Sequence, residues 1–299
     1  DNLSVGSRAD LAKICDFVEN SPPDFSGASD SDPVVQLVVG DILDERTVAQ
    51  ALQGVDVVVH LAANTGVGPS VEDPRSDCLS NVMGTFTLLE ASRLAEVKRF
   101  VFASSGAPVG EVKPPIHEEL APHPVSPYGA SKLAGEGYCS AYYRTYGLET
   151  VALRFGNVYG PGSTHKGSVV AKFIRQALVG ETLEIYGDGT QTRDFIYVDD
   201  LIKAIWQASR VPNIGGEVFQ IATNRETTLE ELTNQLLKEL KLIGVHKISV
   251  SNAPSRLGDV QRNFSDTTKA RTFLGWQAKT SLKDGVRKTI RFYQKGFDA

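Results

Sequence analysis

The 299-residue sequence predicts an α/β fold, with a doubly wound parallel sheet and a smaller α/β domain at the C-terminal side. Through the first half, short apolar runs alternate with longer stretches of helical periodicity, a rhythm typical of strand–helix–strand crossovers in a parallel sheet. After about residue 156 this rhythm breaks into loops rich in glycine and proline. The composition, 41% hydrophobic and 22% charged, is that of an ordinary globular protein.

The first domain is expected to span residues 1–155. Its apolar, β-branched runs predict strands that are buried on both faces, at residues 34–39, 55–63, 98–105 and 149–155. Helical periodicity between these runs predicts helices at residues 44–52, 80–96 and 128–147.

The second domain is expected to take up most of residues 156–299, although residues 194–212 are predicted to return to the first domain. Its helices are predicted at residues 227–240, 265–274 and 281–293. Thr228 and Glu231 have the spacing of a capping box at the start of the first of these helices.

Charge and composition exclude several classes of function. A net charge of −5 argues against a nucleic-acid partner, because there is no basic excess to neutralise phosphates. The three cysteines are scattered and the five histidines show no ligand spacing with them, so we predict neither a disulfide framework nor a metal site. No run of about 18 apolar residues occurs, and we expect no signal peptide, no membrane partner and a cytoplasmic protein.

The stretch SPYGASK (126–132) places Tyr128 and Lys132 four residues apart, on one face of a predicted helix. A cation held near a phenol favours the ionised phenolate. With nine tyrosines in the chain, about half a match to this spacing is expected by chance, and a helix start at Pro127 is the plainer reading. However, a predicted strand ends at Ser104 and Ser105, which can bring hydroxyl groups to the phenol.

A series of motifs in one order extends over nearly the whole chain. They are DNLSVG (1–6), GDI (40–42), VVHLAA (58–63), NVMGT (81–85), FASS (102–105), SPYGASK (126–132), LRFGNVYGPG (153–162), YGDGTQTRDFIYVDDL (186–201) and RLGDVQRNFSDTTKARTFLGW (256–276). In this order the motifs resemble the extended short-chain dehydrogenase/reductases, and specifically the NAD-dependent nucleotide-sugar epimerases of the UDP-glucose 4-epimerase type.

The resemblance implies a Rossmann fold that binds NAD in the first domain. In the family, a strand and a glycine-rich turn precede the acidic residue that Asp1 matches, so about 30 residues of this unit are expected to be absent from the sequence. The glycine clusters at 65–68, 160–162 and 187–189 follow the wrong strands to replace that turn. We therefore expect weak NAD binding from this chain as it stands.

The resemblance also implies the residues of the cofactor site. Asp1 would bind the adenosine ribose, and Thr65 stands where many epimerases have a lysine. Asn81 has a second reading, as a residue that shapes its helix by hydrogen bonding. The implied cofactor contacts are Asp1, Asn2, Ser4, Asp41, Ile42, Leu61, Ala62, Ala63, Thr65, Ser80, Asn81, Ser104, Tyr128, Lys132 and Phe155.

By the same resemblance the substrate is a UDP-hexose, and Ser105, Tyr128 and Lys132 are the catalytic residues. Lys132 and the nicotinamide are expected to lower the pKa of Tyr128 from about 10 toward neutrality. Each apolar member of the substrate set has core packing as its other reading. The implied substrate contacts are Ser105, Tyr128, Asn157, Val169, Val170, Ile185, Tyr186, Arg193, Arg256, Asp259 and Asn263.

Two alternatives remain open. A sugar 4,6-dehydratase or a decarboxylase can be built on the same fold, but the dehydratase needs acids where this chain has Gly106 and Ala107. The second alternative is a non-catalytic sugar-nucleotide-binding protein. The resemblance further implies a homodimer. It also places Asn263 beside the 2-substituent of the sugar, where a tyrosine would narrow the substrate pocket, so we expect the smaller asparagine to admit N-acetyl sugars.

Overall fold

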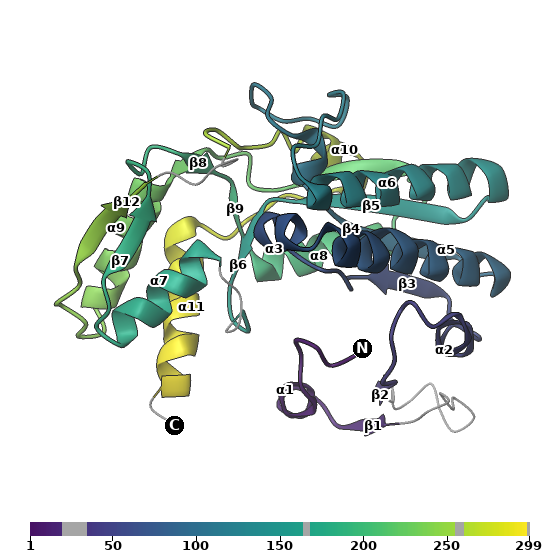
Figure 1. The fold of residues 1–299 in the computed structure, drawn as a ribbon, viewed down its shortest axis with the longest axis horizontal. Coiled ribbons are helices and arrows are strands. Elements are labelled where there is room, and N and C mark those ends of the chain that lie inside the picture. The colour runs from purple at the N-terminus through teal and green to yellow at the C-terminus, as the bar shows by residue number, and fades with distance from the viewer. Residues whose placement is uncertain (20–34, 164–167, 255–259, 298–299) are drawn as a thin grey trace. The chain divides into compact units, whose positions relative to one another are not determined.

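The computed structural model of the protein describes residues 1–19, 35–163, 168–254 and 260–297 (Figure 1). Its contacts divide the chain into two compact units, and each unit combines segments from distant parts of the sequence. The first unit comprises residues 1–107, 126–152 and 212–217, and the second comprises residues 108–125, 153–211 and 218–299.

The main sheet has four strands in the order β10 (Glu217–Ile221), β5 (Glu149–Phe155), β4 (Arg99–Ser105) and β3 (Val57–His60). β3 and β4 are parallel, and β4 and β5 are buried along almost their whole length, as the sequence predicts. β3 differs from the prediction, because Val57 and Val59 are 39% and 40% exposed. Val58 and His60, on the other face of β3, are buried, so β3 is packed on one face only. The predicted α/β class is confirmed.

The helices of the first unit follow the strands as predicted, with one difference. The predicted helix at 80–96 consists of the π-helix η1 (Leu79–Met83) and α5 (Gly84–Leu94), and a short helix outside the predicted range, α4 (Pro74–Cys78), comes directly before them. α2 (Glu45–Ala51) and α6 (Pro127–Tyr146) match their predictions within a few residues. α5 and α6 pack on each other, and both run along the strands of the main sheet (Figure 1).

The first residues of the chain form a small layer of their own. α1 (Arg8–Ala12) leads to β1 (Phe17–Glu19), which pairs in parallel with β2 (Val35–Leu37). Asp1 is bonded to the residues after β2, because its ammonium donates to the Val38 carbonyl and its own carbonyl accepts from the Gly40 amide. α3 (Val67–Glu72) follows β3.

The second unit contains short strands paired two by two. β6 (Asn157–Tyr159) is parallel to β9 (Phe195–Tyr197), β7 (Leu183–Tyr186) is parallel to β12 (Val250–Ala253), and β8 (Thr192–Arg193) is antiparallel to β11 (Thr227–Thr228). Residues 194–211 lie in this unit, whereas the sequence predicts a return of 194–212 to the first domain. The reason is that β9 pairs with β6 and α8 (Val198–Ala208) packs on both.

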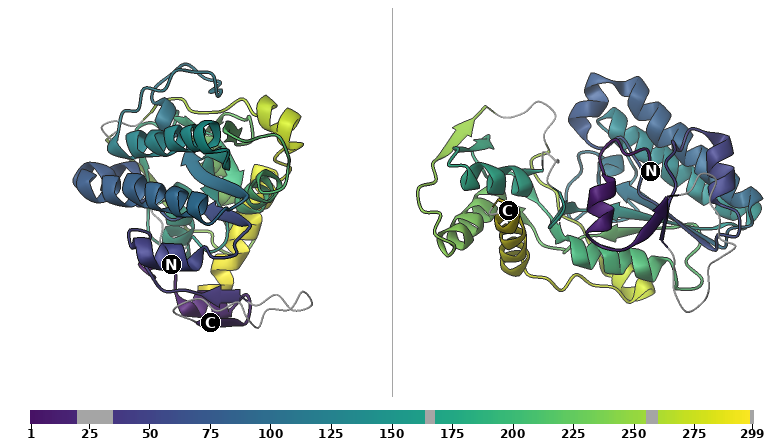
Figure 2. Two further views of the ribbon diagram at one scale, coloured as in Figure 1. Left: turned by 90° about the vertical axis from the view of Figure 1, so that its right-hand side faces the viewer. Right: turned by 90° about the horizontal axis from the view of Figure 1, so that it is seen from below.

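The core of the second unit lies between three helices, α7 (Val169–Leu178), α9 (Leu229–Lys241) and α11 (Leu282–Phe297). The right-hand view of Figure 2 shows these helices grouped, and α11 contacts the other two. The predicted capping box is confirmed at the start of α9, with both reciprocal bonds of Thr228 and Glu231. α10 (Thr268–Leu274) completes the predicted helices.

Among the described residues, every helix is too short or too polar to cross a lipid bilayer. Within the same ranges, no group of three or more His, Cys, Asp or Glu side chains is arranged to hold a metal ion.

Candidate active site

The first two turns of α6 carry two of the three predicted catalytic residues. Ser126 caps the helix, since its hydroxyl accepts from the Gly129 amide at 3.1 Å, and Pro127 stands at the first helical position. Tyr128 and Lys132 therefore lie one turn apart on one face, as their spacing predicts. A Cβ at Gly135, one turn further, would collide with the Phe102 ring, so glycine lets α6 pack closely on β4.

Lys132 is a buried cation, with only 3% of its surface exposed. Its Nζ donates to the carbonyl oxygen of Ala103 at 2.9 Å, and it lies 5.0 Å from the centroid of the Phe102 ring and 5.9 Å from that of Tyr128. Burial lowers the pKa of Lys132 to about 8, while the Asp77 carboxylate acts in the opposite direction. The ammonium is thus fixed to the end of β4, beside the phenol.

The groups of the protein alone raise the pKa of Tyr128 above its ordinary value. The predicted lowering includes the charge of the nicotinamide, and it stays a prediction. Burial of the phenol is the largest cause, a hydrogen bond with Ser105 lowers the pKa, and the Asp77 carboxylate raises it. The Lys132 ammonium donates to a backbone carbonyl and lies 5.9 Å from the centroid of the Tyr128 ring. Tyr128 is therefore a neutral phenol in this structure, and its ionisation requires a further positive charge close to it.

Ser104 and Ser105, at the end of β4, have different partners. The Ser104 hydroxyl is buried and donates to Oε1 of Glu136 at 2.5 Å. Ser105 is half-buried, accepts from the Ala107 amide at 3.2 Å, and hydrogen-bonds with Tyr128. Ser105 is thus the hydroxyl beside the phenol, whereas Ser104 is engaged inside the unit.

Asn81 lies in the π-helix η1, and protein partners use both ends of its amide. Its Nδ2 donates to the Asn64 carbonyl at 2.9 Å, to Asp77 at 2.8 Å and to Ser131 at 3.2 Å, while its Oδ1 accepts from the Asn64 amide at 2.8 Å. Single-turn π-helices occur often at functional sites. Here the π-helix points Asn81 inward, where it joins the loop after β3 to α6, in agreement with its helix-shaping reading.

His60 ends β3 as a buried, neutral side chain. Its Nε2 lies 2.9 Å from the Thr85 hydroxyl, and its ring is tilted against Phe100 and Phe102. Burial, and then the charge of Lys132, lower the pKa of His60 to about 3. The imidazole therefore stays uncharged at neutral pH and packs against the Phe100 and Phe102 rings of β4.

The predicted contacts of the adenosine end of the cofactor are exposed and polar. Asn2 donates to Asp41 at 3.2 Å, joining the start of the chain to the loop after β2. The Asp1 carboxylate accepts from the Leu3 amide at 2.6 Å, and Ser4 is exposed as well. An exposed carboxylate at the carboxyl end of strands suits a ribose, so these residues fit the cofactor that the resemblance implies.

The segment after β3 fits the approach of a cofactor to the backbone. Leu61, Ala62 and Thr65 are exposed and Ala63 is half-buried, and two of these four side chains are no larger than a methyl group. Ile42 packs against Gly84 at the start of α5, where a Cβ would collide with it. The remaining two predicted contacts, Ser80 in η1 and Phe155 at the end of β5, are half-buried.

In the second unit, Arg193 and Asn263 are brought together around Thr192. Arg193 donates through one guanidinium nitrogen to the carbonyls of Thr192 and Val260, both at 2.7 Å. The backbone N–H of Asn263 donates to the Thr192 hydroxyl at 3.3 Å. These bonds hold β8 against residues 260–263, so Arg193 and Asn263, both predicted to contact the substrate, lie close together in this unit.

The predicted base-pocket residues divide into two groups. Val170 and Ile185 are 2% and 6% exposed and belong to the core between α7 and β7, which favours their packing reading. Val169 and Tyr186 are only partly buried, and Lys172 lies 5.1 Å from the centroid of the Tyr186 ring. Asn157 is exposed at the start of β6. The predictions at Arg256 and Asp259 lie outside the described residues.

Two buried carboxylates near Tyr128 are missing from the sequence-based site. Glu136 accepts from Ser104, and Asp77 accepts from Asn81. Both carry a signal in the sequence, because Glu136 continues the four-residue spacing of Tyr128 and Lys132, and Asp77 stands four residues before Asn81. That spacing predicts a shared helix face but does not reveal that the face is buried.

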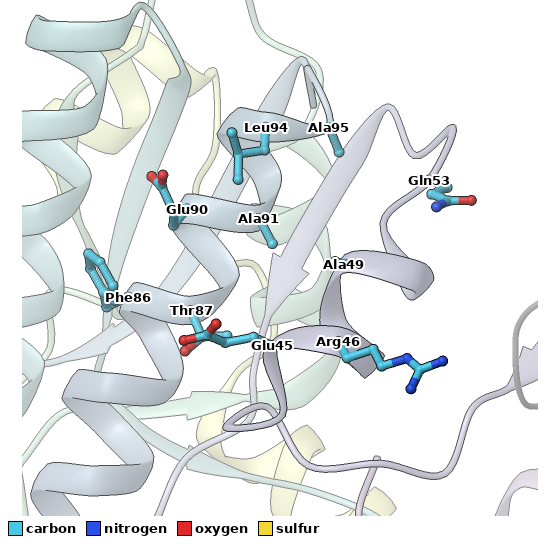
Figure 3. A pocket seen from close by; sticks show the side chains of 10 residues that line it. All are labelled: Glu45, Arg46, Ala49, Gln53, Phe86, Thr87, Glu90, Ala91, Leu94 and Ala95. Carbon is cyan, nitrogen blue, oxygen red and sulfur yellow. The ribbon is translucent and has the colours of Figure 1, made fainter.

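A separate groove of about 650 Å³ lies between α2 and α5. Figure 3 shows the ten residues that line it, of which five are polar: Glu45, Arg46, Gln53, Thr87 and Glu90. Glu90 is already paired with Arg93 and accepts from the Tyr142 hydroxyl at 2.9 Å. The groove contains none of the predicted site residues.

Comparison with known proteins identifies a family. The model of the NAD dependent epimerase/dehydratase family matches residues 13–222 of the chain. Among curated proteins, the chain is 39% identical over 264 residues to a UDP-glucose 4-epimerase of Mycolicibacterium smegmatis, a match that covers 87% of this chain and 83% of that relative.

Solved structures give the same result. The UDP-glucose 4-epimerase of Thermotoga maritima, solved with UDP-glucose, aligns with a TM-score of 0.82 at 36% identity, over 94% of this chain and 91% of that one. The UDP-glucose 4-epimerase of Thermus thermophilus, solved with NAD, aligns with a TM-score of 0.82 at 32% identity, over 98% of this chain and 89% of that one.

Proposed function

Because the chain belongs to the NAD-dependent epimerase/dehydratase family, we propose that it is a 4-epimerase that interconverts UDP-glucose and UDP-galactose. One observation carries the proposal: Ser105 and the buried Lys132 lie beside the phenol of Tyr128, at the carboxyl end of β4. The relatives named UDP-glucose 4-epimerase support the choice of sugar nucleotide.

In this proposal Tyr128 takes the proton of the sugar 4-hydroxyl, and Ser105 hydrogen-bonds the same oxygen. NAD supplies hydride acceptance from C4 and hydride return to the opposite face of the sugar. Lys132 stabilises the phenolate of Tyr128. Because the phenol is neutral in this structure, its ionisation needs a second positive charge besides Lys132. Asp1, Asn2 and the segment after β3 would hold the cofactor.

The second unit would bind the UDP part of the substrate. Arginine suits a diphosphate because its planar fork can bind two oxygens at once, and Arg193 is oriented by two backbone carbonyls. Arg256, Asp259 and Asn157 are the further proposed contacts. Asn263 would stand beside the 2-substituent of the sugar and leave room for an N-acetyl group.

A 4,6-dehydratase is the main competitor within the family. It has to eliminate water from the sugar and needs an additional acid–base pair for that step. In this chain Gly106 and Ala107 follow Ser105, and neither can donate or accept a proton. These two residues support the epimerase.

The test is to incubate the protein with NAD and UDP-galactose and to identify the product by NMR. We expect UDP-glucose, and UDP-N-acetylglucosamine from the N-acetyl substrate. A 4-keto-6-deoxy sugar would favour the dehydratase. UDP-galactose binding without any product, at saturating NAD, would favour the non-catalytic alternative.

The proposal includes the organisation of the protein. Residues 1–155 would bind NAD and residues 156–299 mainly the sugar nucleotide, in a cytoplasmic homodimer. Sedimentation velocity tests the dimer.

A further inference from the structure

Asp77 is a buried carboxylate that no sequence motif assigns to the site. It lies in α4 with 1% of its surface exposed. Its Oδ1 accepts from Asn81 at 2.8 Å, and its Oδ2 has no hydrogen-bond partner among the described residues. An unpaired oxygen on a buried carboxylate is costly, so a role for its charge has to be sought.

A hydrogen-bonded path leads from Asp77 to the first turn of α6. Nδ2 of Asn81 bonds both Asp77 and, at 3.2 Å, the hydroxyl of Ser131. Ser131 in turn donates to the carbonyl of Tyr128 at 3.0 Å, and Lys132 is the next residue. α4 and η1 both pack on α6, the helix that carries Tyr128 and Lys132 in its first two turns.

The ammonium of Lys132 needs a buried anion close to it. Its Nζ donates to the neutral carbonyl of Ala103, and a buried charge is stable only when another charge compensates it. The titratable groups around it are His60, Asp77, Tyr128, Glu136 and Cys139. Burial keeps His60 neutral and raises the pKa of the Cys139 thiol, so neither supplies the anion.

Two carboxylates remain, and they are placed differently. Glu136 accepts the short hydrogen bond of Ser104. Asp77 is the anion whose charge raises the pKa of Lys132, and it also raises that of Tyr128. The charge of Asp77 thus acts on both groups of the catalytic pair.

We propose that Asp77 is a positioning residue of the active site, whose negative charge keeps the buried ammonium of Lys132 protonated and whose bond to Asn81 holds the first turn of α6. This inference rests on the proposed function, because it assigns Asp77 a role through Tyr128 and Lys132. Its physical content, a charge coupling between Asp77 and Lys132, is measurable without turnover.

The test is the titration of Lys132 in the protein labelled with ¹³C at lysine Cε, followed by NMR from pH 6 to 10. The signal is assigned by its loss in Lys132→Arg. In the wild type we expect a midpoint near the pKa of about 8. In Asp77→Asn the midpoint falls by about one pH unit, since a nearby opposite charge is lost. An unchanged midpoint in Asp77→Asn overturns the proposal.

Three further variants separate charge from structure. Asp73→Asn removes an exposed carboxylate one turn away, keeps the cap of α4, and should leave the midpoint unchanged. Asp77→Glu keeps the charge and should restore the wild-type midpoint. If Glu136→Gln lowers the midpoint while Asp77→Asn does not, Glu136 is the counter-ion and the proposal fails.

If Asp77→Asn does not fold, the coupling can be read from the other partner. In wild-type protein labelled at the aspartate carboxyl carbon, the Asp77 resonance should move as Lys132 loses its proton near pH 8, and this step should vanish in Lys132→Met. An Asp77 resonance that is flat through that range contradicts the proposal. Neither reading depends on epimerase activity, so a failure of the proposed function is detected separately.

Discussion

The two clusters of predicted site residues are stabilised in different ways. In the first unit, Lys132 and Ser104 are almost fully buried, and their polar atoms bond to β4 and α6. In the second unit, Arg193 and Asn263 are half-buried. Arg193 donates to the backbone carbonyls of Thr192 and Val260, and the backbone N–H of Asn263 donates to the Thr192 hydroxyl.

This difference indicates where each kind of change is tolerated. A buried network fixes geometry and proton affinity, and removing one member leaves another polar group unsatisfied. Side chains that are held by backbone carbonyls can be exchanged with less effect on their surroundings. We therefore expect the first cluster to control chemistry and the second to control affinity and choice of substrate.

The largest expected effect is in the first cluster. Tyr128→Phe should lower kcat about 10³-fold, because only the proton acceptor is lost. The dissociation constant for UDP-galactose, measured by calorimetry, should stay within about twofold of wild type. Tyr138→Phe, which removes the hydroxyl of a residue that is 40% exposed on the same helix, is the control. Near-normal turnover in Tyr128→Phe would remove Tyr128 from the mechanism.

The second cluster should respond in affinity. Arg193→Gln is expected to weaken UDP-galactose binding about thirtyfold, as a charge-assisted phosphate contact is lost, with a smaller change in kcat. The control is Arg262→Gln, three residues after Asp259, whose guanidinium pairs with Glu226 instead. Equal effects of the two substitutions on the dissociation constant would argue against a diphosphate contact at Arg193.

Acid should destabilise the first cluster through His60. Its pKa is about 3 when folded against 6.5 ordinarily, so between these values the unfolded chain binds the proton and stability falls as pH falls. From pH 7 to 5 this contributes about 2 kcal/mol to the loss of unfolding free energy. Urea unfolding should show a smaller loss in His60→Gln, but not in the exposed His246→Gln. Identical pH dependence in all three proteins would contradict this origin.

The two serines at the end of β4 should separate stability from rate. Ser104→Ala leaves the Glu136 carboxylate without that donor and should lower the unfolding free energy by about 1–3 kcal/mol. Ser105→Ala should lower kcat about tenfold with little loss of stability, since one bond to the reacting oxygen is removed. Thermal melts and initial rates distinguish the two, and the reverse pattern would exchange their roles.

The smallest expected effect concerns substrate size. Asn263→Tyr should lower kcat/KM for UDP-N-acetylgalactosamine relative to UDP-galactose about fivefold, because overpacking a site costs about 1–3 kcal/mol. The hydrogen bond from Asn263 to the Thr192 hydroxyl is donated by the backbone N–H of residue 263, so it should survive the change. If the ratio of the two kcat/KM values does not move, Asn263 is no gatekeeper.

The sequence predicts the elements that carry the catalytic pair. β4, β5 and α6 occur within two residues of their expected bounds, because long apolar runs and a Ser-Pro helix start are strong local signals. The shared face of Tyr128 and Lys132 follows from helix geometry alone.

The remaining features depend on tertiary packing. The π-helix at 79–83 shifts the backbone bonding by one residue, which apolar periodicity does not encode. The raised pKa of Tyr128 results from burial, a property of the packed structure. The same holds for the exposed face of β3, since the position of a strand in its sheet is not a local property.

The central claim, that the hydride removed from C4 returns to C4, can be tested with UDP-galactose that carries deuterium at C4. For an epimerase that regenerates its own NAD, we predict UDP-glucose with the deuterium retained at C4, observed by NMR. Deuterium transferred to C6 of a 4-keto-6-deoxy product, or lost to the solvent, would contradict epimerisation by this site.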